Sequence, residues 1–425
     1  MTIKITGLSK CLVTLEHMTD NNLYSNCQHG FRKKRSCITQ LLEVYDRLTE
    51  MIDDGKSVDI IYLDFKKAFD SIPHERLLLK MGGYGISGNI LNWVRDFLSN
   101  RKQKVRVGNS MSKETCVTSG IPQGSILGPV LFTIFINDLP DELNVQCKVF
   151  ADDTKIYDDA RNQREIQDDL YQMQTWTERW NLYFNVAKCK VMHIGKKNPE
   201  NPYYMKIENS NEALQKCEEE KDLGITFDKK LNFDNHIVNI VKKANQMLGI
   251  IKRTFTFKSK SIFLKLYKAL VRSHLEYGNV IWSPYLKRQS ILIERVQRRA
   301  TKLVPECRDM NYTERLKYLE LHSLKGRRTR GDLIQVFKIF KGLDDIKVED
   351  IFCISSYGST RNQGQKLRKR HCKTDIRKYS FSNRIVELWN SLPLEIKNAE
   401  TVNTFKNRID KNQKLLEKFY TFDEG

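Results

Sequence analysis

The spacing of apolar residues changes near residue 233, and this change constrains the fold more than any other feature of the sequence. Before it, residues 38–53 carry apolar positions at helical spacing and stop before Gly55, and VDIIYLDF (58–65) is a short β-branched run. Further helices are predicted at 87–99, 126–137 and 162–183, with strands at 103–107, 146–151, 154–157, 189–194 and 222–227. This alternation predicts an α/β or α+β domain.

Beyond residue 233 the pattern is almost entirely helical. Amphipathic segments predict helices at 234–254, 259–273, 287–304 and 324–341. The stretch 355–373, SSYGSTRNQGQKLRKRHCK, is rich in Ser, Gly, Arg and Lys, and it predicts an exposed linker or arm before a short helical tail.

The formal net charge of +20 is concentrated in this second part. Residues 1–230 hold 32 Lys and Arg against 32 Asp and Glu, whereas residues 231–425 hold 40 against 20. A solvated basic surface is the simplest interpretation. The excess also suits contact with a phosphate backbone, because cationic side chains release its counterions on binding.

Hydropathy and cysteine spacing argue against a membrane-spanning protein and against a zinc-binding protein. No stretch approaches the run of about 20 apolar residues that spans a bilayer, so we expect an intracellular protein with no membrane partner. The ten cysteines include no CxxC pair or zinc-type spacing, and the adjacent His371 and Cys372 have no second pair to complete a metal site.

Two acidic sites stand out against this background. Asp64 lies inside the apolar strand 58–65, where an unpaired carboxylate would cost several kcal/mol of desolvation. Asp152 and Asp153 lie in VFADDTKIY, where two strand-like segments flank a turn. Each site alone has a structural interpretation, a paired strand-end acid or a solvated turn. Together they could hold a pair of Mg²⁺ ions, which prefer carboxylates and phosphate oxygens, about 4 Å apart for an in-line phosphoryl displacement.

Between the acids lies SGIPQGSILGPVLFTIFIND, a loop that opens an apolar helix. Gly120 and Gly124 would let backbone approach a bulky ligand closely, and Gln123 projects as an amide with donors and an acceptor. Such a loop alone is a weak signal, because the glycines can serve the turn geometry only.

The order of these pieces resembles the reverse transcriptases of non-LTR retrotransposons, particularly the jockey-like elements. QHGFRKKRSC, YLDFKKAFD, SGIPQGS, FADD, NVAKCKVMHIG and EKDLGITFD occur in the order and at the spacings usual in that family. The resemblance continues through HIVNIVKKANQMLGIIKR, LEYGNVIW, ERVQRRATK and NRIVELWNSLP. It implies an α+β right-hand polymerase fold: partial fingers and palm at 1–230, a basic helical thumb at 231–305, and a C-terminal helical region at 306–425.

The resemblance also implies a catalytic group. Asp64 and Asp152 match the principal metal ligands and Asp153 the third acid of the palm, which would hold two Mg²⁺ ions, with Mn²⁺ as a substitute. Lys188 matches the lysine that faces the departing pyrophosphate and can protonate it, although Lys190 is only two residues away.

Further residues match the nucleotide and primer sites of the family. Phe69 matches the bulky gate that collides with a 2′-hydroxyl and so selects deoxynucleotides, although without the motif it would be interpreted as a core aromatic. Leu223 and Gly224 are the centre of EKDLGITFD, which resembles the primer grip. The remaining predicted nucleotide-binding residues are Phe65, Gln123, Gly124 and Arg32.

The implied partners are an RNA template, a DNA primer or nicked target DNA, and deoxynucleoside triphosphates. We expect the chain to act in nucleus and cytoplasm as a ribonucleoprotein. It begins at MTIKITGLSK, just after the position of the family's arginine-bearing fingers motif, so weak primer extension is expected from it. Two alternatives stay open: a truncated or decayed product that binds nucleic acid without polymerising, and a maturase-like RNA-binding protein that keeps the palm as a scaffold.

Overall fold

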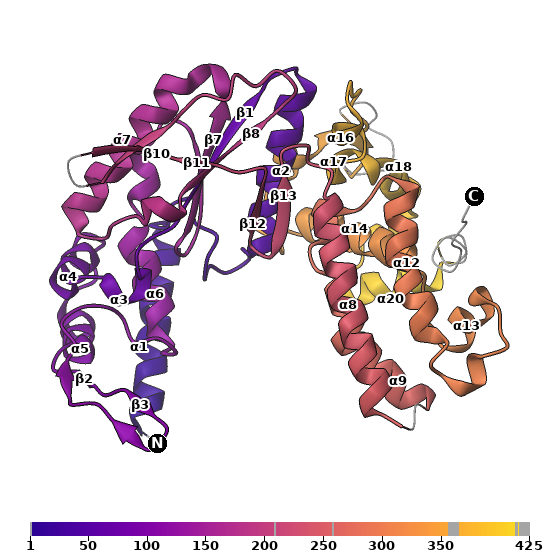
Figure 1. The fold of residues 1–425 in the computed structure, drawn as a ribbon, viewed down its shortest axis with the longest axis horizontal. Coiled ribbons are helices and arrows are strands. Elements are labelled where there is room, and N and C mark those ends of the chain that lie inside the picture. The colour runs from indigo at the N-terminus through magenta and orange to yellow at the C-terminus, as the bar shows by residue number, and fades with distance from the viewer. Residues whose placement is uncertain (1, 208–209, 257–258, 356–364, 413–414, 416–425) are drawn as a thin grey trace. The chain divides into compact units, whose positions relative to one another are not determined.

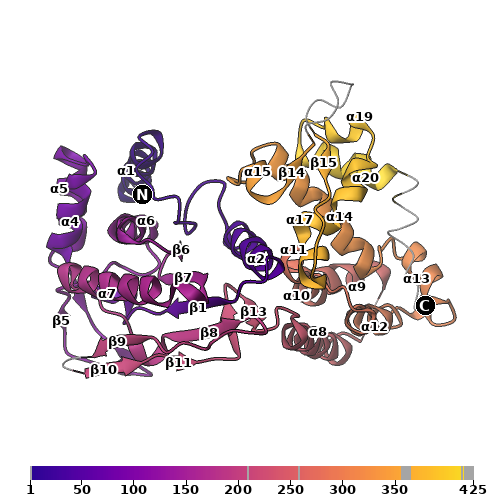
Figure 2. The ribbon, with the colours of Figure 1, turned by 90° about the horizontal axis from the view of Figure 1, so that it is seen from above.

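The computed structural model describes residues 2–207, 210–256, 259–355, 365–412 and 415, and it divides into two compact units (Figures 1 and 2). The first unit comprises residues 1–40 and 56–218, and the second comprises 41–55 and 219–425. The longer segment of the second unit begins twelve residues before the predicted start at 231, and it contains both predicted C-terminal regions, 231–305 and 306–425. No helix in the described ranges is both long and apolar enough to cross a bilayer.

A five-stranded sheet forms the centre of the first unit, with β1 (Val58–Leu63) in its middle. Its strand order is β11 (Gln215–Lys216), β8 (Lys190–Ile194), β1, β7 (Asp153–Asp159) and β6 (Gln146–Phe150). All pairs are antiparallel except β11 with β8. The apolar run of β1 is explained by this position, because strands flank it on both sides and five of its six residues are buried. The four predicted strands of this sheet are confirmed.

Helices cover the sheet, and the most apolar of them is the most buried. Nine of the ten residues of α6 (Leu127–Ile136) are buried, as expected for a helix that is apolar all round. It packs against α1 (Thr2–Asp20) and α4 (His74–Gly83). The prediction missed α1, because its apolar residues do not follow a single stripe. The other helices are α3 (Ala68–Ser71), α5 (Gly88–Leu98), α7 (Gln163–Trp180), η1 (Leu139–Glu142), η2 (Ala160–Asn162) and η3 (Val186–Lys188).

Two hairpins extend the first unit, and one of them corrects a prediction. The predicted strand 103–107 is broken into β2 (Lys102–Gln103) and β3 (Arg106–Val107), which pair with β5 (Thr115–Cys116) and β4 (Ser110–Met111) respectively. The other hairpin pairs β9 (Tyr204–Ile207) with β10 (Ser210–Ala213).

The second unit is mainly helical, as predicted. Its longer helices are α8 (Asp234–Thr254), α12 (Lys287–Thr301), α14 (Leu324–Phe340) and α20 (Val402–Lys411). The predicted helix 259–273 is interrupted: a π-helical turn, η4 (Tyr267–Arg272), separates α9 (Lys260–Leu266) from α10 (Ser273–Glu276). The shorter helices are α11 (Asn279–Trp282), η5 (Pro305–Cys307), α13 (Tyr312–Tyr318), α15 (Val348–Ile351), α16 (Asp375–Lys378), α17 (Phe381–Arg384), α18 (Val386–Asn390) and α19 (Leu394–Lys397).

The predicted strand 222–227 is also corrected. These residues form most of a hairpin between β12 (Glu219–Asp222) and β13 (Ile225–Asp228). Leu223 and Gly224 have φ of 44° and 89°, and two successive residues with positive φ make the tight turn that joins two antiparallel strands.

Helix α2 (Cys37–Asp53) belongs mostly to the second unit and is bound there by the C-terminal region. Asp46 forms a buried ion pair with Arg377 at 2.7 Å. One and two turns later, Glu50 pairs with Arg370 at 2.8 Å and Asp53 accepts a hydrogen bond from the Thr374 amide at 2.7 Å. These three acids recur at helical spacing, so they lie on one face of α2.

These contacts correct the predicted linker at 355–373. Residues 356–364 lie outside the described residues, but β15 (Leu367–Arg368) pairs with β14 (Cys353–Ile354), and Leu367 is buried. The basic residues that suggested a solvated arm include Arg370, which binds Glu50 of α2. The composition predicted an exposed arm because, in the sequence, a cation that pairs with a distant acid is indistinguishable from a solvated cation.

Candidate active site

The antiparallel register of β1 and β7 brings two acidic segments to one edge of the sheet. Leu63, the last residue of β1, is the Cα partner of Thr154. Asp64 follows Leu63, and Asp152 and Asp153 stand directly before Thr154, where Phe150 and Asp153 pair across the turn between β6 and β7. Residues 88 positions apart in the chain therefore meet at the end of the central strand.

The turn that carries Asp152 is held by residues whose role the sequence did not show. Ala151 takes a φ of 55°, and its amide donates to Gln28 Oε1 at 3.2 Å. The Gly30 amide donates to the same oxygen at 2.7 Å, and a Cβ on Gly30 would lie 2.5 Å from the Ala151 nitrogen. The segment QHGF thus fixes the acidic turn from beside β6. A buried Gln next to His and Gly carries no local signal for this, because its partner is 123 residues away.

The carboxylates of Asp64 and Asp152 interact electrostatically. Burial raises the pKa of Asp152, and the negative charge of Asp64 raises it further. Asp64 Oδ2 is buried and has no hydrogen-bond partner among the described residues. A divalent cation would satisfy a solvent-shielded carboxylate oxygen that stands beside a second carboxylate, so these two residues fit a metal site.

The third predicted acid is placed differently. Asp153 is exposed at the start of β7. Within the described ranges, no group of three or more His, Cys, Asp or Glu side chains is arranged to hold a metal ion. The structure therefore brings Asp64 and Asp152 together but does not form a three-carboxylate cluster. Asp153 as a ligand stays a prediction.

Lys188 lies at the acids, and Lys190 is placed along the strand instead. Lys188 Nζ is 3.4 Å from Asp64 Oδ2, and the Asn185 amide, in the same segment, donates to the Asp64 carbonyl at 2.7 Å. Lys190 lies in β8, where it is the Cα partner of Tyr62 of β1. The Lys188 side chain is two-thirds exposed, so the ion pair contributes little stability and leaves the ammonium free to move.

The loop 119–125 is tied to the segment that carries Phe69. Phe69 is half-buried and stacks on Phe132 of α6 with ring centroids 4.6 Å apart, and its carbonyl accepts from the Ile121 amide at 2.7 Å. Gln123 is exposed, and its Nε2 donates to Asp70 Oδ1 at 3.0 Å. Phe69 and Gln123 therefore come from neighbouring segments that share hydrogen bonds.

The two glycines of this loop serve different purposes. This corrects the prediction that both let backbone approach a bulky ligand. A Cβ on Gly120 would lie 2.6 Å from the Asp70 carbonyl oxygen, so Gly120 permits close approach of the protein's own backbone and not of a ligand. Gly124 has open space around its Cβ position and a φ of 79°. Only Gly124 is placed to let a ligand come near.

Comparison with known proteins assigns the family. A family model described as reverse transcriptase (RNA-dependent DNA polymerase) matches residues 1–250, more than half of the chain. The chain belongs to the reverse transcriptase family. The match includes the acids, the loop 119–125 and the hairpin β12–β13.

The curated relatives of this reverse transcriptase confirm its resemblance to the jockey-like elements. The probable RNA-directed DNA polymerase from transposon BS of Drosophila melanogaster is 27% identical over 314 residues, covering 68% of this chain and 33% of that protein. The RNA-directed DNA polymerase from mobile element jockey of the same species is 27% identical over 266 residues, covering 59% and 29%. The chain spans about a third of the length of these relatives.

A solved structure of telomerase from Candida albicans, in complex with a TWJ fragment of telomeric RNA, is similar to the chain at a TM-score of 0.43 and 10% identity. The similarity covers 75% of this chain and 57% of that chain, and it does not bear on the family assignment.

Three further residues predicted for the reverse transcriptase site pack against, or form hydrogen bonds with, other residues of the protein. The Phe65 ring is 5% exposed and stacks on Phe184 with centroids 4.3 Å apart. Arg32 is half-buried, lies over the Tyr24 ring and donates to the Ser25 carbonyl at 2.7 Å. Leu223, in the second unit, accepts a hydrogen bond at its carbonyl from the Tyr277 hydroxyl at 2.8 Å. Their functional roles stay predictions.

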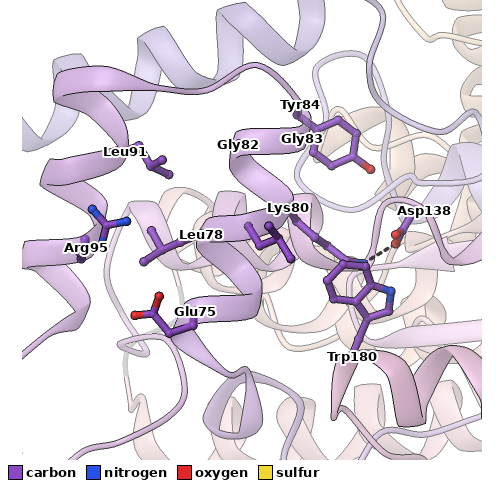
Figure 3. Close-up of a pocket in the computed structure, with 11 residues that line it drawn as sticks. Glu75, Leu78, Lys80, Gly82, Gly83, Tyr84, Leu91, Arg95, Asp138 and Trp180 are labelled. Atoms are coloured by element: carbon purple, nitrogen blue, oxygen red, sulfur yellow. Dashed lines mark hydrogen bonds and ion pairs between the residues drawn. The ribbon is translucent and has the colours of Figure 1, made fainter.

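One cavity of the first unit lies away from the acids. It has a volume of about 680 Å³ and is lined by side chains of α4 and α5 together with Asp138 and Trp180 (Figure 3). Lys80 crosses it, forms an ion pair with Asp138 and lies 3.9 Å from the Trp180 ring centroid. None of the predicted site residues lines this cavity.

Proposed function

We propose that this chain is the polymerase part of a reverse transcriptase and adds deoxynucleotides to a primer 3′ end on an RNA template. The observation that carries the proposal is the β1–β7 register, which joins Asp64 to the turn of Asp152 within the segment that matches the family. In the reaction the primer 3′ oxygen bonds to the α-phosphorus, and the bond from that phosphorus to the pyrophosphate oxygen breaks.

The acids would hold the cations that this reaction needs. Asp64 and Asp152 would bind them, with Asp153 as a further ligand, and Mg²⁺ is the ion that such oxygen ligands favour. When bound, two such ions supply charge stabilisation for the attacking and the leaving oxygen. Asp64 Oδ2 is shielded from solvent, accepts no hydrogen bond from the described residues and is 3.4 Å from Lys188 Nζ, so it keeps a lone pair for a cation at this edge of the sheet.

Other residues of the chain would position the nucleotide and move a proton. Lys188 Nζ, held near Asp64, is suited to donate a proton to the departing pyrophosphate oxygen. The Phe69 ring, backed by Phe132, would stand beneath the sugar and collide with a 2′-hydroxyl. Gln123 would contact the nucleotide from the adjacent loop, and the turn of Leu223 and Gly224 would hold the primer.

Primer extension by Asp152→Asn tests the proposal. Asn keeps the shape of the side chain but removes the ligand charge, so the rate on a poly-rA template with Mg²⁺ should fall roughly a thousandfold, equivalent to about 4 kcal/mol. Asp168→Asn, which changes an exposed acid of α7, should extend at the rate of the unchanged chain. Template binding should persist in both variants. Extension by Asp152→Asn at an undiminished rate would refute the metal-dependent mechanism.

A further inference from the structure

A basic ribbon, defined here as residues 101–117, connects α5 to the loop 119–125. Its strands pair as β2 with β5 and β3 with β4, and between these pairs the Ser112 amide donates to the Val105 carbonyl at 2.9 Å. Every residue from 102 to 116 is exposed. Figure 1 shows β2 beside α5 at the lower margin of the first unit, with β3 farther along the same margin. Both faces of the ribbon are therefore open to a partner.

The sequence of the ribbon separates charge from apolar side chains. In KQKVRV, Lys102, Lys104 and Arg106 alternate with Gln103, Val105 and Val107. Lys102 and Lys104 share one face, because both ammonium groups pair with Glu114. Arg106 begins the next strand, β3, and its Nε donates to the Gly108 carbonyl at 3.0 Å. Side chains two residues apart recur about every 6.7 Å, roughly twice the 3.4 Å rise per nucleotide along one strand of a duplex.

The positive charge of the ribbon is local and only partly neutralised. Residues 102–116 contain four Lys or Arg and one acid, Glu114, and so carry +3, whereas residues 1–230 as a whole balance 32 basic against 32 acidic residues. Glu114 is shared by Lys102 at 2.7 Å and Lys104 at 3.2 Å. The ribbon therefore presents a surplus of cations that its own acids do not match.

The base of the ribbon is anchored, so the cations keep a defined direction. A two-stranded ribbon alone is at best marginally stable in water. Arg101 Nε donates to the Leu98 carbonyl at 3.1 Å, and its Nη2 donates to the Gly120 carbonyl at 2.5 Å. The Val117 amide closes the base by donating to the Arg101 carbonyl at 2.8 Å. This base adjoins the loop that carries Gln123.

We propose that the basic ribbon binds the phosphate backbone of a nucleic-acid duplex, independently of sequence, outside the group of acids. This deepens the proposed function, on which it rests for the class of partner. A row of exposed cations on an anchored ribbon complements a row of phosphates. A second copy of this chain would bring the same positive charge to the ribbon, which disfavours self-association at this face.

The test compares two triple variants of the full chain. Lys102→Gln/Lys104→Gln/Arg106→Gln removes three of the exposed cations of the ribbon. Lys196→Gln/Lys197→Gln/Lys206→Gln changes three exposed lysines elsewhere in the first unit and lowers the net charge by the same amount. Binding of a short fluorescent DNA duplex, and of an RNA–DNA hybrid of the same sequence, is measured by anisotropy across salt concentrations without nucleotide or divalent ion.

We expect the ribbon variant to lose two to three units of the slope of log K against log salt, because each phosphate contact contributes about 0.9. The control variant should keep the slope of the unchanged chain. An unchanged slope in the ribbon variant, or an equal loss in the control, would overturn the inference. So would a change in sedimentation with unaltered duplex binding, which would identify a protein partner instead.

These outcomes are separable from the failure of the proposed function. Binding is measured without nucleotide or divalent ion, so a chain that cannot polymerise can still show the ribbon-dependent slope, and the inference then stands alone. If the chain polymerises normally but the slope of log K against log salt is the same in both variants, the proposed function stands and the inference about the ribbon is refuted.

Discussion

Replacing Lys80 by Met should change how the stability of the protein depends on pH. Lys80 is 5% exposed, donates to the Phe135 carbonyl at 2.6 Å and has the rings of Phe135, Trp176 and Trp180 around its ammonium (Figure 3 shows Trp180). Burial lowers its pKa from 10.5 to about 8, although the ion pair with Asp138 opposes the shift. That difference corresponds to about 3 kcal/mol.

The direction of the pH effect follows from these two pKa values. Below about pH 8 the ammonium is charged in the folded and the unfolded chain, and the folded state carries the whole cost of desolvating it. Between about pH 8 and 10.5 the folded amine is neutral while the unfolded chain still binds the proton, so the free energy of unfolding rises with pH. The rise due to Lys80 should be about 1.5 kcal/mol between roughly pH 8 and pH 9.5.

Urea unfolding of the unchanged chain and of Lys80→Met across this pH range measures the effect. Other titrating groups are common to both proteins and cancel in the difference, and the comparison of slopes also removes any pH-independent change in packing. Lys196→Met, at an exposed position, should follow the unchanged chain. Parallel curves for the unchanged chain and Lys80→Met would refute the reasoning, because they would mean that the ammonium is not desolvated in the folded state.

Two further predictions concern the nucleotide gate and the C-terminal contact with α2. Phe69→Val should raise the ratio of ribonucleotide to deoxynucleotide incorporation without abolishing synthesis, and an unchanged ratio would mean that the ring serves only to pack on Phe132. Arg377→Met should lower the free energy of unfolding by about 3 to 5 kcal/mol, because it leaves Asp46 buried without its partner. In urea titrations the double variant Asp46→Leu/Arg377→Met should recover most of that loss, and Lys378→Met should leave the free energy of unfolding unchanged. A loss below about 1 kcal/mol in Arg377→Met would contradict the contact.

The sequence by itself determined the elements that local patterns encode. The apolar run of β1, the helical spacing of 38–53 and the turn between β6 and β7 each follow from side chains close together in the chain, so their existence and approximate bounds were predictable. The order of the motifs also identified the family. The acids were candidates from sequence because a carboxylate in an apolar strand needs a partner wherever the strand lies.

Only the tertiary structure decided which distant residues support these elements. Gln28 and Gly30 hold the turn of Asp152 across more than a hundred residues, and Arg377 binds Asp46 of α2 from the C-terminal region. Leu223 and Gly224 belong to the second compact unit, not to the unit of the acids. Periodicity reports which face of an element is apolar, but it does not report which element covers that face. A buried cation and a solvated one therefore look alike until the chain has folded.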